Sequence, residues 1–154
     1  MPPVVRHAIT LSARVLLSLI FVLSAVDHLR HWNGAVKRMT AQGMGFEGVL
    51  GSGAPVLVQV LLALGVVFLL LGGLSVMLGI RARWGAAMLL VFIVPATLVF
   101  HDFWTHPAGS GDYTNQLHHF LKNLGLTGGL LTILGFGSGG FSLDMFLPRR
   151  RPPA

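Results

Sequence analysis

The sequence predicts an all-α integral membrane protein whose four transmembrane helices form an up-and-down bundle. Of its 154 residues, 53% are hydrophobic and only 10% are charged, whereas a soluble domain carries roughly 25% charged residues. A chain with so little charge cannot cover a water-facing surface. One bilayer crossing needs about 20 apolar residues, so four crossings fit the length with room for loops, and six would leave almost none.

Four apolar segments account for these crossings, and polar residues separate them. They are residues 8–26, 55–80, 84–100 and 116–136. Arg14 lies inside the leading edge of the first segment, and a basic carboxyl-terminal tail, residues 148–154, follows the fourth. We expect a single membrane domain over residues 1–154.

The placement of basic residues predicts the orientation in the membrane. One side holds Arg6, Arg81, Arg83, Arg149, Arg150 and Arg151. The other side holds Arg30, Lys37, Arg38 and Lys122. Since cytoplasmic loops carry the excess of Lys and Arg, both termini are expected in the cytoplasm and the long loops in the periplasm of a bacterial inner membrane. The basic residues are scattered at segment ends rather than gathered in a patch, so no nucleic-acid partner is expected.

Small residues recur along the second and fourth segments. Gly65, Gly72 and Gly79 are spaced by seven residues and share one helix face, while Gly125 and Gly129 form a GxxxG motif. Small residues let helix backbones approach closely in lipid. We therefore expect close packing within the bundle, with a homo-oligomer contact through Gly125 and Gly129 as the alternative.

Polar residues gather at the outer side of the predicted bundle. Six of the seven histidines lie there: His28, His31, His101, His106, His118 and His119. They occupy three helix ends that meet in one layer of an up-and-down bundle. Asp102 belongs to the same layer.

The fourth segment carries a polar stripe. Gln116, His119 and Asn123 share one helix face, and Lys122 flanks it. Polar groups at membrane depth are costly unless they face the bundle interior. The stripe is therefore expected to point inward, toward the outer-side residues that follow the first and third segments: His28, His101 and Asp102.

Three interpretations of this layer remain open. The polar groups could only fasten the helix ends. They could instead bind a quinone or another small carbonyl compound, with His101 and His119 exchanging protons, Asp102 setting the state of a neighbouring histidine and Lys122 stabilising negative charge. The further ligand-binding candidates are Arg14, His28, Trp104, Gln116 and Asn123.

The third interpretation is a metal or haem site of unknown metal. Its candidate ligands are His28, His31, His101 and His119. His28 and His31 stand at i and i+3, a spacing that allows chelation, but the sequence contains no HExxH or HxH motif. Cysteine is absent, which excludes thiolate metal ligands and disulfides.

Several blocks resemble the DoxX family of small four-span membrane proteins. The strongest is His101-Asp102-Phe103-Trp104, followed by Gln116 and by His119-Phe120-Leu121-Lys122-Asn123-Leu124 with Gly128-Gly129. Arg14-Val15-Leu16-Leu17, Phe21 and Ser24, and the later Gly72-Gly73, Gly79 and Arg83, also match. One departure is His28, where relatives often have a lysine.

The DoxX resemblance implies a four-helix inner-membrane protein, linked in some members to quinone-coupled oxidation of sulfur compounds or to redox complexes. It favours a membrane subunit of an oxidoreductase complex, with a quinone as ligand and other membrane or periplasmic subunits as partners. The alternative is a non-catalytic accessory subunit.

Overall fold

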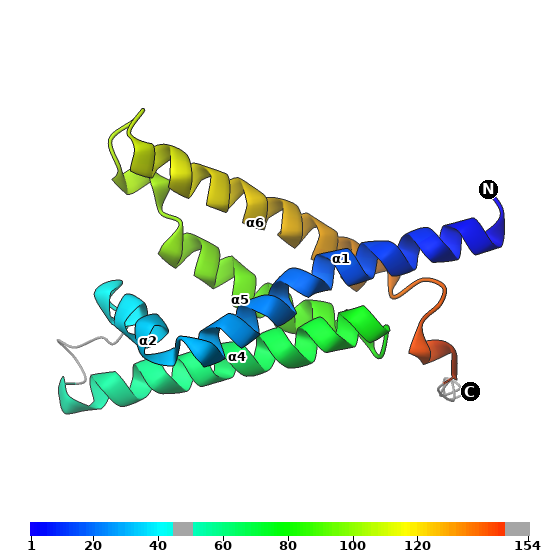
Figure 1. Cartoon of the computed structure of the whole chain (residues 1–154), viewed down its shortest axis with the longest axis horizontal. Helices are drawn as coiled ribbons and strands as arrows, with labels where there is room; N and C mark the ends of the chain where they lie inside the picture. Colours follow the sequence, from blue (N-terminus) through cyan, green and yellow to red (C-terminus); the bar gives the residue numbers. More distant parts are fainter. Residues whose placement is uncertain (45–50, 147–154) are drawn as a thin grey trace, which may run out of the picture.

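The computed structural model describes residues 1–44 and 51–146 (Figure 1), and in these ranges the protein is all-α, as predicted. Its helices are α1 (Pro3–Arg30), α2 (Trp32–Ala41), α4 (Ala54–Leu78), α5 (Ala82–Phe100) and α6 (Gly111–Phe136). Three short 3-10 turns accompany them: η1 (Gly51–Gly53), η2 (Phe103–Thr105) and η3 (Leu143–Phe146). The predicted basic tail, residues 148–154, lies outside the described residues.

Helices α1 and α6 begin several residues before the apolar segments that predicted them, whereas α4 ends at Leu78, two residues before its predicted end. Pro3 sits in the first turn of α1, where its missing N–H costs no hydrogen bond. Helix α6 begins at Gly111, directly after Ser110, whose hydroxyl accepts a hydrogen bond from the backbone of Tyr113. Apolar patterning marks only the part of a helix that avoids water, so it understates helices with polar ends.

Three helical stretches are long and apolar enough to cross a membrane: Pro3–Arg30, Gly51–Leu78 and Ala82–Thr105. In their most apolar parts only 22% to 28% of the residues are buried within the fold, so most of the apolar side chains face outward, as they do in lipid-facing helices. Helix α6 is not among the three, because its first half carries His119, Lys122 and Asn123.

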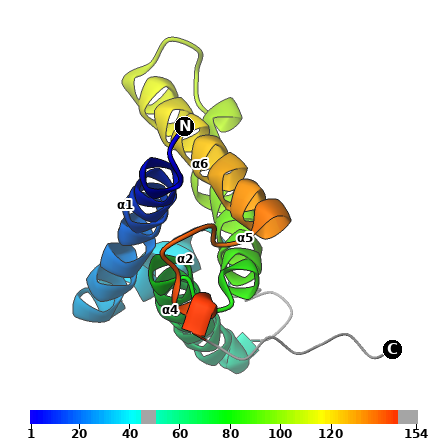
Figure 2. The ribbon, with the colours of Figure 1, turned by 90° about the vertical axis from the view of Figure 1, so that its right-hand side faces the viewer.

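Helix α4 lies between α1 and α5, and α6 packs on the outer side of α5 (Figure 2). The four long helices α1, α4, α5 and α6 alternate in direction (Figure 1), so the amino end of α1, the α4–α5 turn and the carboxyl end of α6 share one end of the molecule. We call this the terminal end, and the opposite end the loop end. Helix α1 meets α6 near the terminal end, where Leu17 packs against Gly129.

Two of the three glycines predicted on one helix face, Gly65 and Gly72, lie in α4 and are used for packing within the chain, whereas Gly79 follows the end of α4 in a left-handed conformation. A Cβ atom at Gly65 would lie 2.9 Å from the ring of Phe92 on α5. At Gly72 it would lie 2.9 Å from the backbone oxygen of Gly85. The helices therefore approach closely because both lack side chains at this crossing. Gly125, by contrast, has nothing within 4 Å of an added Cβ.

The start of α6 offers a direct stability test. Ser110 Oγ accepts a hydrogen bond of 3.1 Å from the Tyr113 backbone N–H, which satisfies one of the unpaired donors of the first turn. We expect Ser110→Ala to lower the free energy of unfolding by about 1 kcal/mol. Thermal unfolding in detergent measures this. Ser110→Asp, which also caps helices, should retain most of the stability, and equal losses in both variants would contradict the capping role.

Candidate functional site

Two histidines from different helices stack at the corner where α5 turns into α6. His101 directly follows α5 and His119 lies in the first half of α6. Their ring centroids are 5.1 Å apart and the ring planes differ by 17°. Both side chains are half-buried. The structure therefore brings together the two residues that the sequence proposed for proton exchange.

Each of these imidazoles has a different polar partner, and the partners fix the tautomers. His101 Nδ1 lies 2.9 Å from the Gln116 side-chain oxygen, which can only accept, so His101 carries its proton on Nδ1. Lys122 Nζ lies 3.2 Å from His119 Nδ1. Because an ammonium only donates, that nitrogen accepts, and the neutral His119 ring carries its proton on Nε2. We call His101, Gln116, His119 and Lys122 the histidine site.

Asn123 faces the bundle interior, as the stripe on α6 predicted, but its partner was missed. Its side-chain amide donates to Thr97 Oγ1 at 3.0 Å. Thr97 in turn donates to the Ile93 backbone oxygen at 2.6 Å and is buried within α5. The sequence did contain a signal for this partner, because Thr97 places a hydroxyl in an apolar segment one helical turn before His101. This link fastens α6 to α5 beneath the histidine site.

The sequence predicted that Asp102 acts on a neighbouring histidine, and in the structure its carboxylate lies nearest His106. One of its carboxylate oxygens accepts a 3.1 Å hydrogen bond from the Thr105 hydroxyl, and the other lies 4.0 Å from His106 Nε2. In this loop it therefore neighbours His106 rather than His101 or His119. The carboxylate organises the turn at η2.

Aromatic rings hold this turn against α6. The Phe103 ring meets the rings of Trp104, Tyr113 and Phe120 edge-on, with centroids 5.1, 5.7 and 5.3 Å away. Trp104 also contacts Phe120 and remains 53% exposed. Edge-to-face packing of this kind fixes the loop after α5, and it keeps His101 in place over α6.

His28 and His31 lie at another corner of the loop end, next to α2. His28 Nδ1 bonds to the backbone oxygen of Ser24 in its own helix at 2.6 Å, and His31 pairs with Asp27 at 2.9 Å. Figures 1 and 2 both show the carboxyl end of α1 well separated from the amino end of α6. The expected single layer is therefore divided, because α1 packs along α4 and meets α6 only near the terminal end.

Arg14 lies at the terminal end. Its side chain is 2% exposed, and Nη2 donates to the Phe141 backbone oxygen at 2.7 Å. Helix α5 starts at this end and finishes beside His101, and its 19 residues span roughly 28 Å at 1.5 Å per residue. Arg14 therefore cannot contact the same small ligand as the histidine site.

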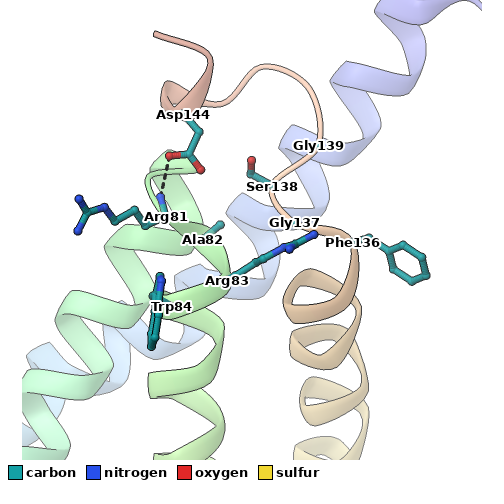
Figure 3. Close-up of a pocket in the computed structure, with 9 residues that line it drawn as sticks. All are labelled: Arg81, Ala82, Arg83, Trp84, Phe136, Gly137, Ser138, Gly139 and Asp144. Carbon is teal, nitrogen blue, oxygen red and sulfur yellow. Dashed lines mark hydrogen bonds between the residues drawn. The ribbon is translucent and has the colours of Figure 1, made fainter. Parts of the chain in front are cut away.

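The structure also contains a cavity that the sequence did not indicate. Its volume is about 390 Å³, and it opens at the terminal end between the start of α5 and the loop after α6 (Figure 3). The residues that line it are Arg81, Ala82, Arg83, Trp84, Phe136, Gly137, Ser138, Gly139 and Asp144. They come from segments far apart in the chain, so sequence patterns could not gather them.

The described residues offer no cluster of ligands that would support the metal interpretation. Among the residues that the structure describes, no three His, Asp or Glu side chains are arranged to hold an ion. Its candidate ligands His28 and His31 lie at one corner of the loop end, and His101 and His119 at another.

A family model described as HR-like lesion-inducing matches residues 6–136. The chain belongs to the HR-like lesion-inducing family. A Surfeit locus protein 4 homolog of Schizosaccharomyces pombe is similar to part of it, with 32% identity over 69 residues. This alignment covers 45% of the chain but only 23% of that relative. No solved structure matches the chain.

The DoxX resemblance is therefore wrong. The blocks that carried it, around His101 and His119, lie inside the region matched by the HR-like lesion-inducing family. They combine apolar helix residues with aromatic and polar residues at a helix end, a composition that many membrane helices share. Such short blocks are too general to separate one family of small membrane proteins from another.

Proposed function

We propose that this member of the HR-like lesion-inducing family is a membrane protein whose histidine site binds a small ligand of the quinone class. One observation carries the proposal: in the stacked pair, Gln116 and Lys122 engage the two Nδ1 atoms, which leaves both Nε2 atoms for a ligand. These contacts leave His101 Nε2 as an acceptor and His119 Nε2–H as a donor, and neither atom has a hydrogen-bond partner among the described residues.

This pair of groups offers one contact to each redox form of a quinone. A hydroxyl of the reduced ligand can donate to His101 Nε2, and a carbonyl of the oxidised ligand can accept from His119 Nε2–H. Lys122 donates to the other nitrogen of His119, which polarises the ring and strengthens its remaining N–H as a donor. The exposed ring of Trp104 nearby offers an apolar surface to such a ligand.

The same proposal includes α6 as a fourth membrane span. Its second half is apolar, and its polar first half turns Asn123 toward α5 instead of lipid. With four spans the terminal end would face the cytoplasm by its arginine content, and in a bacterial inner membrane the histidine site would face the periplasm. Gly125 has open space around it, which leaves room for a second copy at this helix.

The protein side chains at the histidine site exchange protons but not electrons. An oxidoreductase role would thus require a second membrane or periplasmic subunit that takes electrons from the ligand. The alternative function is a non-catalytic accessory protein, in which the Gln116–His101 and Lys122–His119 contacts only hold α6 on α5.

Ligand titration tests the proposal. A short-chain quinone is titrated into the purified protein in nanodiscs, with Trp32 and Trp84 replaced by Phe so that quenching reports on Trp104. We expect saturable quenching, and we expect His101→Ala to raise the Kd about tenfold, because one hydrogen bond to the ligand is lost. His119→Ala should have a similar effect.

His31→Ala is the matched control, because His31 is an exposed histidine paired with Asp27 at the other corner. It should leave the Kd unchanged. If the protein with only Trp32 and Trp84 replaced showed no saturable quenching, the quinone proposal would be overturned. If the His101 and His119 variants then lowered thermal stability, the accessory function would be supported instead.

A further inference from the structure

We propose that the cavity at the terminal end binds the phosphate group of an anionic phospholipid, with Arg83 as the residue that recognises it. This site lies at the opposite end of α5 from the histidine site and does not depend on the quinone proposal. Its 390 Å³ volume is at the small end of the range for ligand pockets, which suits a headgroup rather than a larger ligand.

The aromatic residues of the cavity place it at the depth of lipid headgroups. Trp84 is 73% exposed and Phe136 is 86% exposed. They lie at the start of α5 and the end of α6, and in Figure 3 they flank the two sides of the opening. Exposed aromatic side chains at the ends of apolar helices are typical of the membrane–water interface. A ligand in this cavity can therefore keep its acyl chains in the bilayer.

The guanidinium of Arg83 supplies the anion-binding group. It reaches from the first turn of α5 to the last turn of α6, where Nη2 donates to the Gly135 backbone oxygen at 3.1 Å. Figure 3 shows the side chain extending toward Gly137. The bond to Gly135 is its one hydrogen bond among the described residues, so other N–H groups of the planar fork remain for a phosphate, whose geometry they match. Ser138 adds a hydroxyl to the lining.

Arg81 also lines the cavity, but its side chain points to the other side in Figure 3. Its backbone N–H donates to Asp144 Oδ1 at 2.8 Å. Asp144 is the one acidic residue in the lining of this cavity, and the hydrogen bond directs its carboxylate toward the backbone of Arg81. Arg83 therefore points into the site and Arg81 points away from it, although both carry the same charge. Comparing variants of the two residues can thus distinguish specific recognition of a phosphate from general attraction to an anionic surface.

The far wall of the cavity is built by residues 137–144, which we call the strap. Asp144 N–H donates to the Gly79 oxygen at 3.1 Å, and buried Arg14 bonds to Phe141. The strap is thereby tied to both α1 and the α4–α5 turn. A wall held by contacts to two other elements keeps its shape when a ligand is absent.

Lipid titration tests this site. Purified protein in detergent is titrated with phosphatidylglycerol, with phosphatidylcholine and with inorganic phosphate, and binding is followed by thermal unfolding. We expect phosphatidylglycerol to stabilise the protein saturably. Arg83→Ala should raise its Kd at least about tenfold, since charge-assisted hydrogen bonds are lost, while Arg81→Ala should raise it less than about threefold. Arg83→Gln, which keeps a donor for Gly135, should bind as weakly as Arg83→Ala.

Equal losses in the Arg81 and Arg83 variants would overturn the proposal and leave only general electrostatic attraction. Equal stabilisation by phosphatidylcholine would exclude recognition of an anionic headgroup. Equal stabilisation by inorganic phosphate would assign the site to a soluble phosphate and overturn the lipid assignment. Should Arg83→Ala fail to fold, Arg83→Gln decides the outcome.

Discussion

Replacing Gly72 by Leu is expected to destabilise the protein by about 3 kcal/mol, the upper end of the usual cost of overpacking. An added Cβ at Gly72 would lie 2.8 Å from Leu89 and 2.9 Å from the backbone oxygen of Gly85. A backbone oxygen cannot move aside as a flexible side chain can. The larger residue must therefore push α4 and α5 apart, and these two helices carry most of the buried core.

Thermal unfolding in detergent measures the effect, and Gly125→Leu is the matched control. Gly125 also lies in a long helix, but an added Cβ there meets nothing within 4 Å. We expect its variant to unfold within a few degrees of the unmodified protein. Leu favours a helix more than Gly does, so a comparable loss in both variants would mean that the added side chain is costly at either position and that the α4–α5 crossing has no special role.

Replacing Arg14 by Ala is expected to detach the strap from the terminal end and to cost about 3 kcal/mol of unfolding free energy, through a lost hydrogen bond and an unfilled space. Arg14 bonds to Phe141 and packs against Gly79. Gly79 has a φ of +68°, where side chains are strained, and it leaves the space that the guanidinium fills. Arg14→Met should cost less than Arg14→Ala, because its side chain refills part of that space. Both variants remove Nε and Nη1, which have no hydrogen-bond partner among the described residues.

A cysteine reporter distinguishes strap release from general destabilisation. The chain has no cysteine, and Ser142 is only 4% exposed, so Ser142→Cys gives a single buried thiol. We expect slow maleimide labelling with Arg14 present and fast labelling with Arg14→Ala. Arg6→Ala, an exposed arginine in the same helix, should leave labelling slow. Slow labelling with Arg14→Ala would show that other contacts hold the strap.

Part of the histidine site could be predicted from the sequence. Gln116, His119 and Asn123 lie one helical turn apart, and helix geometry alone puts them on one face. Their partners could not be predicted in full. His101 was expected opposite this face and is found there, but Thr97 was hidden in an apolar run, and Asp102 turns to His106 instead of His101. Which side chains meet across a loop depends on its path, which the aromatic packing of Phe103 decides.

The sequence by itself determined the apolar helices, their order and the glycine face of α4, because apolar composition and helical period are local properties of the chain. Only the tertiary structure decided which helix ends come together. Helix α1 lies along α4 and reaches α6 only near the terminal end, so His28 is separated from His119 and Arg14 instead meets the strap. The cavity near Arg83 likewise exists only because the chain folds back after α6. Contacts between such distant segments depend on where helices cross and on how closely their backbones approach. Local patterns in the sequence do not encode either property.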